Sequence, residues 1–479
     1  MPSYLPATLS APLARGADLL RGALGSVSWG PVLSASKAAV TSLLANIELG
    51  HLTVRDETTG ETMNFGQKIA REYSRKPNGT GANGVHGTRQ SGGVRRVELV
   101  VKRETFWVRL FLFADMGFAE AYMLGDVECE DLTGFFELFI RNRSQLANAT
   151  TLTSSIAATI TGLARSTNTL SNALLNIQAH YDISNEMFAA FLSEDMTYSC
   201  PIWQPVASAD TEEETLEAAQ MTKLNRFIDG ARIKPSDHVL EIGTGWGSFA
   251  MEAVRKTGCR VTTLTLSIEQ KALAEKRIAA AGFEDRIEVL LMDYRALPTP
   301  KVLYDKVVSI EMLEAVGAEY LETYFSCIHR LLKTDGIAVF QCITMPEGRY
   351  EAYARGEDFI RRYIFPGGHL PSISQLVQNI SKGSEGTLVV EKIENIGGHY
   401  AKTLRLWRQA FAKNFESRIR PALMNEHQNM GDREVEVFRR KWIYYFVYCE
   451  AGFATKTLGD VIITVGREGA MELMDGIPL

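Results

Sequence analysis

The chain has 479 residues, of which 46% are hydrophobic and 23% are charged, and its formal net charge is −6. This length suffices for two or three domains, and the composition is ordinary for a globular protein. No apolar run approaches the roughly 18 residues of a membrane span. The six cysteines show no CxxC motif and no paired spacing with histidine, which argues against structural zinc and against a disulfide framework. A reducing, cytosolic setting is therefore expected.

The N-terminal 45 residues are poor in acids and carry Arg15, Arg21 and Lys37 among Ala, Leu and Ser. They lack the basic stretch followed by a continuous apolar stretch that marks a secretory signal. Two interpretations stay open, a mitochondrial transit peptide and an amphipathic first helix, and the helix is favoured.

The region before residue 144 is expected to be a small α+β domain. Residues 50–54 alternate like a strand, and residues 94–113 offer two strands, with Val97 and Leu99 on one face. Residues 132–140 are typical of a short helix. These patterns predict an N-terminal lipid- or substrate-binding domain over residues 1–143.

Positive charge gathers within this N-terminal region. Residues 67–109 contain ten Lys and Arg against three Asp and Glu, although the whole chain is acidic. A basic sector of this kind indicates an anionic partner, either a membrane surface or a nucleic acid. An ordinary solvated face is the alternative.

Residues 144–172 are rich in Ser, Thr and Ala and are predicted to form a linker, so that the catalytic domain spans residues 173–479. Strand and helix patterns alternate there, which predicts βαβ units and a mostly parallel sheet. The predicted strands are 238–242, 260–265, 287–292, 304–309, 336–343, 388–394 and 460–466. The predicted helices are 248–257, 267–281 and 319–332. The stretch 345–387 reads as an insertion that covers the active site.

The most informative segment runs from Val239 to Phe249, where a buried strand breaks into a glycine-rich turn and a helix. Gly243, Gly245 and Gly247 allow a sharp turn and a close approach to a ligand. Such a turn holds a nucleotide-like cofactor at the carboxyl end of a strand, in NAD and FAD enzymes as well.

Neighbouring residues favour S-adenosylmethionine over a dinucleotide. Glu241 stands at the strand end, and Trp246 sits where a pyrophosphate binder would have a small residue. After the next strand, Thr265 and Gln270 would supply hydrogen bonds in place of an acid. The third strand ends at Asp293, beside an adenine-sized slot.

Taken together, the motifs resemble those of the cyclopropane-fatty-acid synthases and their relatives, the mycolic-acid cyclopropane synthases and methyltransferases. The matching segments follow the family's order over residues 180–455, and residues 117–125 resemble the N-terminal domain of the phospholipid-acting synthases. The segments are His180–Asn185, Tyr198–Cys200, Glu241–Gly247, Thr265–Gln270, Asp293–Arg295, Ser309–Gly317, Tyr363–Ser372, Gly398–Tyr400, Thr403, Leu404, Trp407, Trp442 and Cys449–Phe453.

The resemblance implies an α/β fold, with a Rossmann-like class I methyltransferase domain of seven mostly parallel strands and a helical cover. It also implies S-adenosylmethionine as the methyl donor. The residues implied to bind it are Tyr198, Ser199, Glu241, Gly243, Gly245, Trp246, Gly247, Thr265, Leu266, Ser267, Gln270, Asp293, Tyr294 and Arg295.

In this family the methyl group is added to a cis double bond, and a bound bicarbonate removes a proton so that a cyclopropane ring closes. The resemblance places the bicarbonate cage on Cys200, Glu314, Ile343 and Tyr400. Aromatic faces would stabilise the intermediate cation; the candidates are Tyr198, Trp203, Tyr363 and Phe365.

Two positions depart from the family pattern. Gln341 stands where the cage usually has a histidine, and Ala315 replaces the histidine that often follows the family glutamate. Glutamine can exchange hydrogen bonds with bicarbonate but cannot take up a proton. The departure leaves methyl transfer intact and places ring closure in question.

The predicted function is therefore cyclopropanation of an unsaturated phospholipid acyl chain. The alternative product is a methyl or methylene branch on a fatty acyl or sphingolipid chain. A lipid-binding module without catalysis and a nucleic-acid methyltransferase are weaker alternatives. We expect cytoplasmic localisation with peripheral contact to anionic membranes, and neither a metal nor a nucleic-acid partner. The sequence leaves the oligomeric state open, a homodimer included.

Overall fold

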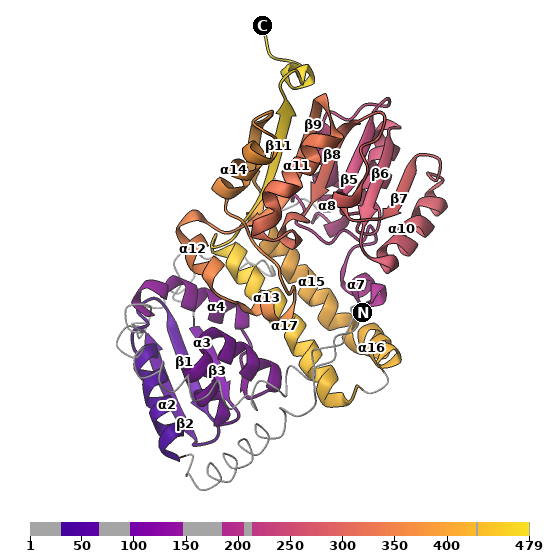
Figure 1. Ribbon diagram of the computed structural model, residues 1–479. Helices are drawn as coiled ribbons and strands as arrows, with labels where there is room; N and C mark the ends of the chain where they lie inside the picture. The colour runs from indigo at the N-terminus through magenta and orange to yellow at the C-terminus, as the bar shows by residue number, and fades with distance from the viewer. Residues whose placement is uncertain (1–29, 67–95, 147–183, 206–212, 428–429, 479) are drawn as a thin grey trace, which may run out of the picture. The chain divides into compact units, whose positions relative to one another are not determined.

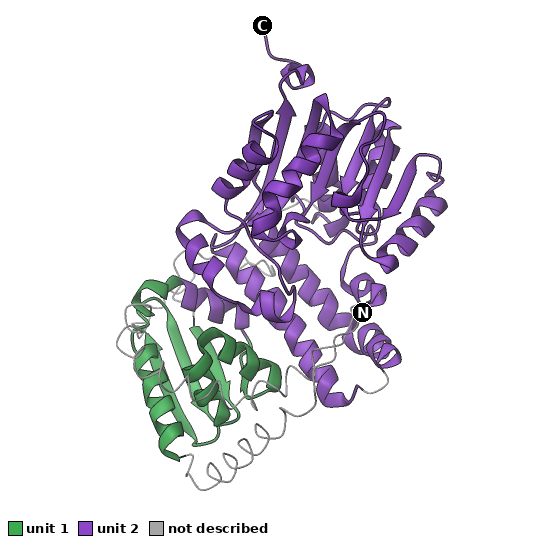
Figure 2. Cartoon of the chain, in the orientation of Figure 1, with its two compact units in different colours: residues 1–130, 141–170 green, residues 131–140, 171–479 purple. Residues whose placement is uncertain are grey.

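The structure, a computed structural model, describes residues 30–66, 96–146, 184–205, 213–427 and 430–478. Chain contacts divide the protein into two compact units (Figure 2). Unit 1 comprises residues 1–130 and 141–170, and unit 2 comprises residues 131–140 and 171–479. Most of the predicted basic sector and linker, and the first 29 residues, lie outside the described residues.

Unit 1 is a four-stranded sheet with helices (Figure 1). The strand order is β2-β1-β3-β4; β1 pairs with β2 in antiparallel and with β3 in parallel orientation, and β3 pairs with β4 in antiparallel orientation. The elements are α2 (Gly30–Leu44), β1 (His51–Asp56), β2 (Glu61–Gly66), β3 (Arg96–Val101), α3 (Thr105–Leu124) and β4 (Val127–Glu128). This confirms the strand predicted at 50–54.

The prediction of two strands within residues 94–113 is half right. Strand β3 buries Val97 and Leu99 on one face, as predicted. The second predicted strand is wrong, because residues 105–113 belong to the 20-residue helix α3. A run such as Phe106 to Val108, apolar and buried throughout, has no period that distinguishes a strand from a buried helix.

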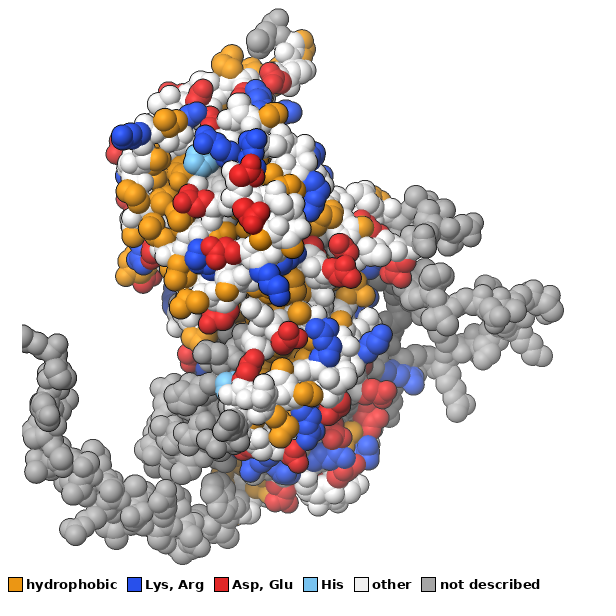
Figure 3. Space-filling view, turned by 90° about the vertical axis from the view of Figure 1, so that its right-hand side faces the viewer, with side chains coloured by type: hydrophobic (Ala, Val, Ile, Leu, Met, Phe, Trp, Pro, Cys, Tyr) orange, Lys and Arg blue, Asp and Glu red, His pale blue; other side chains and the backbone are white. Residues whose placement is uncertain are grey.

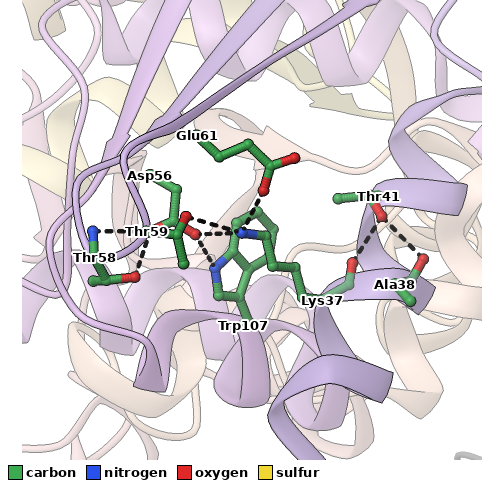
Figure 4. A network of polar contacts seen from close by, with 8 residues as sticks. All are labelled: Lys37, Ala38, Thr41, Asp56, Thr58, Thr59, Glu61 and Trp107. Atoms are coloured by element: carbon green, nitrogen blue, oxygen red, sulfur yellow. Dashed lines mark hydrogen bonds and ion pairs between the residues drawn. The ribbon is translucent and has the colours of Figure 1, made fainter.

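A buried ion pair joins α2 to the strands of unit 1 (Figure 4). Lys37 Nζ lies 2.7 Å from Asp56 Oδ2 and 2.9 Å from Glu61 Oε2. Trp107 of α3 donates its indole N–H to the same Asp56 oxygen at 3.1 Å. Burial alone would raise the pKa of Asp56, but the hydrogen bonds from Lys37, Thr58 and Trp107 outweigh it and lower that pKa. The network therefore locks three elements around one carboxylate.

Unit 2 contains a seven-stranded sheet in the order β10-β11-β9-β8-β5-β6-β7. The strands are β5 (His238–Ile242), β6 (Arg260–Thr265), β7 (Ile287–Leu291), β8 (Tyr304–Ile310), β9 (Leu332–Thr344), β10 (Leu388–Asn395) and β11 (Gly459–Arg467). Only β11 runs antiparallel to its two neighbours. All seven predicted strands, and the mostly parallel α/β sheet, are confirmed.

Helices pack against this sheet (Figure 1). The three predicted helices are confirmed as α9 (Ser248–Thr257), α10 (Ile268–Ala281) and α11 (Leu321–Leu331). The core lies where Tyr324 and Phe325 of α11 pack with Leu240, Val307 and Phe340 of the strands. Further helices are α7 (Asn185–Phe191), α8 (Leu216–Gly230), α12 (Glu347–Arg355), α13 (Phe359–Tyr363) and α14 (Ile373–Gly383).

A helical insertion between β10 and β11 was not predicted. It contains α15 (Tyr400–Asn414), α16 (Arg420–Glu426) and α17 (Asp432–Ala454). Short turns of 3-10 helix stand at Tyr294–Ala296, Leu313–Ala315, Ala318–Tyr320, Gly397–His399 and Met471–Met474, and a π-helical turn at Phe415–Ile419. Within the described residues, no helix combines the length and the apolar character required to cross a membrane.

Helix α4 (Leu132–Arg141) confirms the helix predicted at 132–140, but it packs with unit 2. The ring of Phe136 lies edge-on to Tyr444 at 5.2 Å and to Tyr448 at 5.5 Å. Thr133 also donates to Glu450 at 3.3 Å. We expected this helix in the N-terminal domain, but its aromatic contacts with α17 place residues 131–140 in unit 2.

Candidate active site

The predicted site residues follow four adjacent parallel strands. In the order β8-β5-β6-β7, these strands end at residues 310, 242, 265 and 291. The carboxyl ends of parallel strands share one edge of a sheet, where α/β proteins bind ligands. Figure 1 shows α15 and α17 beyond this edge. The topology therefore brings together the loop after β8 (residues 311–317, the acid loop), the glycine loop (residues 243–247) and the turns after β6 and β7.

The glycine loop adopts backbone conformations that other residues rarely enter. The φ angles of Gly243, Gly245 and Gly247 are 103°, 52° and 87°. A Cβ on Gly243 would lie 3.5 Å from Met312 Cβ, so this loop passes directly beside the acid loop. A Cβ on Gly245 would meet nothing within 4 Å. The loop thus leaves open space at its middle glycine, as a ligand cradle requires.

Trp246 and Glu241 face the interior. Trp246 is 4% exposed and donates its indole N–H to Asn185 Oδ1 at 2.8 Å, so it anchors the loop to α7. Glu241 is buried within β5, and its Oε2 has no hydrogen-bond partner among the described residues. Burial raises the pKa of Glu241 to about 8, against the effect of Thr263 and Lys223. An acid left half-satisfied beside the glycine loop suits a ligand hydroxyl or ammonium group.

The turn after β6 is built around Thr265. Its hydroxyl donates to Gln270 Oε1 at 2.9 Å and accepts from Ser267 N at 3.1 Å. Ser267 in turn caps α10. Leu266 and Ile268 are 74% and 66% exposed, which leaves apolar side chains beside the glycine loop. Such side chains suit the flat face of an adenine.

After β7, Asp293 and Arg295 bind each other. Arg295 Nη2 lies 2.6 Å from Asp293 Oδ2, and the same carboxylate caps the following turn. The hydrogen bonds and charge of Arg295 lower the pKa of Asp293, so the acid is ionised at neutral pH. The Arg295 guanidinium also lies 5.9 Å from the Tyr294 ring centroid. The predicted residues Asp293, Tyr294 and Arg295 therefore hold one another in place at the edge of the sheet.

Helix α8 fixes the segment Tyr198–Cys200. Gln220 donates to Ser199 O at 2.8 Å, and Lys223 Nζ donates to Ser199 Oγ at 2.7 Å. Both α8 side chains are 0% exposed. Burial lowers the pKa of Lys223 to about 8, although nearby carboxylates oppose this shift. The Ser199 hydroxyl is thus used within the protein, and Lys223 places positive charge behind the site.

The centre of the site is a carboxylate that our sequence reasoning missed. Glu311 Oε1 accepts from Cys200 N and from Gln341 Nε2, both at 2.7 Å. Glu311 Oε2 accepts from the Tyr400 hydroxyl, also at 2.7 Å. The motif from Ser309 to Gly317 contains two glutamates, and we assigned a role only to the second. The first lies among the predicted cage residues.

Two further carboxyl groups complete this acid cluster, which we define as Glu311, Glu314 and Asp460. Glu314 Oε1 accepts from Ile343 N at 2.5 Å, while its Oε2 is buried without a hydrogen-bond partner among the described residues. Asp460, also missed, accepts from Gln341 Nε2 at 2.8 Å. The sequence signal for it was an acid inside an otherwise apolar strand.

Burial favours protons on part of the acid cluster. Desolvation, then the charge of Glu311, raises the pKa of Glu314 to about 8. Desolvation and Glu311 likewise hold the pKa of Asp460 far above its ordinary value. Glu311 itself accepts three hydrogen bonds, which favour its ionised form. Desolvation raises the pKa of Glu311 as well, but more hydrogen bonds oppose the rise there than at the other two carboxyl groups.

The described residues do not fit the bicarbonate that we expected. The donors of Cys200, Gln341 and Tyr400 bind Glu311, and the Ile343 N–H binds Glu314. A second anion would find these donors engaged and would face the acid cluster. The predicted cage is thus assembled, but around a protein carboxylate.

Of the four aromatic candidates, Trp203 and Tyr363 are buried, Tyr198 is half-buried and Phe365 is exposed. The Tyr198 hydroxyl exchanges a hydrogen bond of 2.8 Å with the Tyr445 hydroxyl, and the Tyr198 ring lies 5.1 Å from that of Trp407. Trp203 donates to Thr403 at 3.1 Å. Tyr363 is 6% exposed, whereas Phe365 is 41% exposed. An aromatic wall from α15 and α17 therefore stands beside Tyr198.

Two histidines near the matched motifs act as loop anchors. The backbone N–H of His369, in the predicted cover, donates to Glu314 O at 2.8 Å. His399 Nδ1 accepts from Trp203 N at 3.1 Å. Burial lowers the pKa of both rings, so both are neutral at pH 7. The His369 contact ties the 345–387 insertion to the acid loop.

The described part of the basic sector is largely paired within unit 1. Lys102 lies 2.9 Å from Glu57, and the buried Arg109 lies 3.1 Å from Asp126. Charges of both signs are interspersed over the face in Figure 3. A uniformly basic surface is therefore not a feature of these described residues.

Comparisons with known proteins agree with this geometry. The family model for mycolic acid cyclopropane synthetase matches residues 168–462. The chain is 38% identical to tuberculostearic acid methyltransferase UfaA1 of Mycobacterium tuberculosis, over 74% of this chain and 79% of that protein. It is 30% identical to the cyclopropane-fatty-acyl-phospholipid synthase of Escherichia coli, over 80% of this chain and 91% of that protein.

Solved structures point the same way. The crystal structure of mycolic acid cyclopropane synthase CmaA1 with SAH and CTAB is 30% identical, with a TM-score of 0.51, over 61% of this chain and 97% of that one. Coclaurine N-methyltransferase has a TM-score of 0.54 at 19% identity, which supports the fold alone. The chain is thus an enzyme of the methyltransferase fold and belongs to the mycolic acid cyclopropane synthetase family.

Proposed function

We propose that the protein transfers the methyl group of S-adenosylmethionine to the cis double bond of an unsaturated phospholipid acyl chain, and that a cyclopropane ring then closes. The observation that carries this proposal is the acid cluster beside the glycine loop: Asp460 is buried, Glu311 and Glu314 are half-buried, and Met312 lies next to Gly243. The binding site for the methyl donor and the proton acceptor must lie next to each other in such a reaction, because the same methyl group is first transferred and then deprotonated.

The glycine loop and the two following turns suit the methyl donor. Gly245 leaves open space, Leu266 presents an apolar face, and Glu241 offers an unpaired buried oxygen. When bound, S-adenosylmethionine supplies an electrophilic sulfonium methyl group. We assign the donor-binding role to the whole predicted set, with Trp246 and Ser199 acting through structural contacts.

An alkene is a weak nucleophile, so the site must align it with the methyl group and exclude water. The buried Trp203 and Tyr363 and the half-buried Tyr198 are aromatic residues that can stabilise a developing cation without attacking it. The α15 and α17 helices supply the remaining apolar surroundings. The acid cluster would then accept the proton.

The phospholipid part of the proposal draws on the first unit. Residues 168–479 make up about two thirds of the chain, so the 80% covered by the E. coli synthase must include part of the region before residue 168. The tuberculostearic acid methyltransferase alignment extends upstream in the same way. We assign substrate presentation at a membrane to this region.

The test is methyl transfer to a defined lipid. Purified protein is incubated with labelled S-adenosylmethionine and dioleoyl phospholipid vesicles, and the product is analysed by NMR and mass spectrometry. Distearoyl vesicles, which lack the double bond, are the matched control. Label in the oleoyl chains as a cyclopropane methylene is expected; no label in any unsaturated lipid would refute the enzyme proposal.

A second product, an exocyclic methylene branch, is favoured by Gln341. Its amide joins Glu311 to Asp460 where the family has a histidine, and an amide cannot relay a proton. If deprotonation is slow, a hydride can shift first, and loss of a methyl proton then leaves an alkene. A Gln341→His variant in the same assay should raise the proportion of ring to branch. An unchanged ratio would remove Gln341 as the determinant.

A further inference from the structure

We propose that Glu311 is the built-in base of this enzyme, so that its own carboxylate removes the proton from the transferred methyl group and no bicarbonate is required. This inference rests on the proposed function, since it assigns a residue to its second step. It departs from the cage that the family resemblance implies. The hydrogen bonds of Glu311, its backbone conformation and the charges around it each support this assignment.

Hydrogen bonding places a carboxylate where the anion was expected. Three donors converge on Glu311 at 2.7 Å: the N–H of Cys200, the amide of Gln341 and the hydroxyl of Tyr400. A carboxylate and a bicarbonate ion both present a planar pair of oxygens to such donors. The side chain therefore satisfies the cage from within the protein.

Backbone conformation shows that this placement is maintained against strain. Glu311 has a φ of 48°, in the left-handed region that favours glycine. Its N–H donates to Gln341 O at 3.0 Å, which holds the residue at the end of β8. Strained backbone of this kind concentrates at functional sites. A glutamate kept where glycine fits more easily indicates that the side chain is needed.

Surrounding groups oppose the effect of desolvation on the Glu311 carboxyl group. Desolvation raises the pKa of Glu311 above its ordinary value, while the hydrogen bonds from Cys200 and Tyr400 and the charge of Lys223 act to lower it. The groups facing it are Cys200, Glu314, Tyr400, Asp460 and Lys223. A carboxylate whose pKa is raised above its ordinary value is a stronger base than an exposed one, which suits general base catalysis.

The step balances without another reactant. The alkene electron pair forms a bond to the methyl carbon, and the sulfur–methyl bond breaks with its pair remaining on sulfur. The cation left on the second alkene carbon is discharged when Glu311 takes a proton from the new methyl group. The released C–H pair forms either the third ring bond or, after a hydride shift, an exocyclic double bond. Glu311 then returns its proton to solvent.

The experiment compares wild-type protein with two variants in buffer freed of carbonate by argon and acid sparging, and again with added bicarbonate. Glu311→Gln keeps the shape of the side chain but removes its basicity. Glu311→Gly relieves the left-handed backbone and frees the three donors. Glu385→Gly is the matched control, because Glu385 is exposed, has a φ of 54° and lies in a turn after α14.

We expect the wild-type rate to be the same with and without bicarbonate. Glu311→Gln should lose about 100-fold or more in kcat, the range associated with a general base. Glu311→Gly should lose as much and recover about tenfold when bicarbonate enters the vacated cage. ¹³C-bicarbonate binding, followed by NMR, should appear in Glu311→Gly and not in the wild type. Glu385→Gly should match the wild type in every assay.

Two results would overturn the assignment. One is a wild-type rate that falls about tenfold without bicarbonate and returns with it. The other is a Glu311→Gln variant that keeps more than about a tenth of the wild-type rate. Binding of S-adenosylmethionine, measured by calorimetry, should be unchanged in that variant; weakened binding with unchanged kcat would show a binding role instead. Absence of methyl transfer by the wild type in both buffers would refute the proposed function itself.

Discussion

At the residue scale, the acid cluster is the feature that links the two proposed steps, methyl transfer and deprotonation. Glu311 collects donors from three separate segments, and Gln341 bridges it to Asp460. Lys223 stands behind them as a buried cation bound to Ser199. The ionisation of one carboxylate therefore depends on contacts made by α8, β9, β11 and α15.

Lys223→Met should shift the acid limb of the kcat/KM profile to higher pH. The ammonium of Lys223 lowers the pKa of Glu311, so its removal raises that pKa and the base is protonated over a wider range. Initial rates measured from pH 5 to 9 test this, and a thermal unfolding scan confirms that the variant is folded. An unshifted acid limb would mean that Glu311 ionisation does not govern the rate.

Glu314→Gln should change how stability depends on pH. The pKa of Glu314 rises from 4.5 to about 8 on folding, so between these values the folded protein binds a proton that the unfolded chain releases. The free energy of unfolding from this group therefore falls as the pH rises through that window. Urea unfolding at pH 6 and pH 8 should show a smaller decline in the variant than in the wild type. Equal declines would contradict the shift.

At the element scale, the sheet edge brings together loops that are distant in sequence. The glycine loop follows β5 and the acid loop follows β8, and the two touch at Gly243 and Met312. The insertion between β9 and β10 reaches the same place through His369. Three connections of one sheet thus supply the proposed donor cradle, the proposed proton acceptor and the predicted cover.

Gly245→Ala should weaken S-adenosylmethionine binding by about tenfold or more while leaving most of the stability, since only the ligand space is lost and the strain at its φ of 52° costs about 1 kcal/mol. Gly258→Ala is the matched control: its φ is 76°, it also meets nothing within 4 Å, and it stands at the far end of α9. Calorimetric titration of both variants is the measurement. Equal affinities would exclude the loop as the cradle.

Much of this architecture could be predicted from sequence. Strands β5 to β11 were recognised because each is a short apolar run bounded by turn residues. The segment after Thr105 was misread because its apolar residues are continuous. Helices α15 and α17 were missed because their charged and aromatic residues were interpreted only as motif matches.

The site was predicted in part. Cys200, Gln341 and Tyr400 were named from the family resemblance, and they do converge. Their partner Glu311 was missed, because the resemblance supplied an external anion for the same donors. Only the three-dimensional contacts reveal that a side chain already holds that position. The role of Asp460 depends likewise on β11 lying between β9 and β10.

At the scale of the whole molecule, the two units divide the proposed task. Unit 2 carries the predicted donor-binding and acid residues, and unit 1 is a separate sheet held by the Lys37 and Asp56 network. Family alignments that extend before residue 168 involve proteins whose names refer to phospholipid or tuberculostearic acid. Unit 1 is therefore the part that we propose meets the lipid surface.

The full chain should bind anionic vesicles in a salt-sensitive way. Residues 67–109 carry an excess of basic residues, and each well-placed one contributes about 1 kcal/mol at an anionic surface. Co-sedimentation with phosphatidylglycerol vesicles at 50 and 500 mM salt is the measurement, with phosphatidylcholine vesicles as the control. Binding that salt does not reduce would contradict an electrostatic membrane contact.

The most direct test of a shared transfer and deprotonation site uses S-adenosylmethionine with a trideuterated methyl group. The enzyme is incubated with dioleoyl phospholipid, and the acyl products are analysed by mass spectrometry. We predict that each modified chain retains two of the three deuterium atoms, because one is removed from the transferred methyl group whether a ring or an exocyclic methylene forms. Retention of all three, or the absence of deuterium from the acyl chains, would contradict the account.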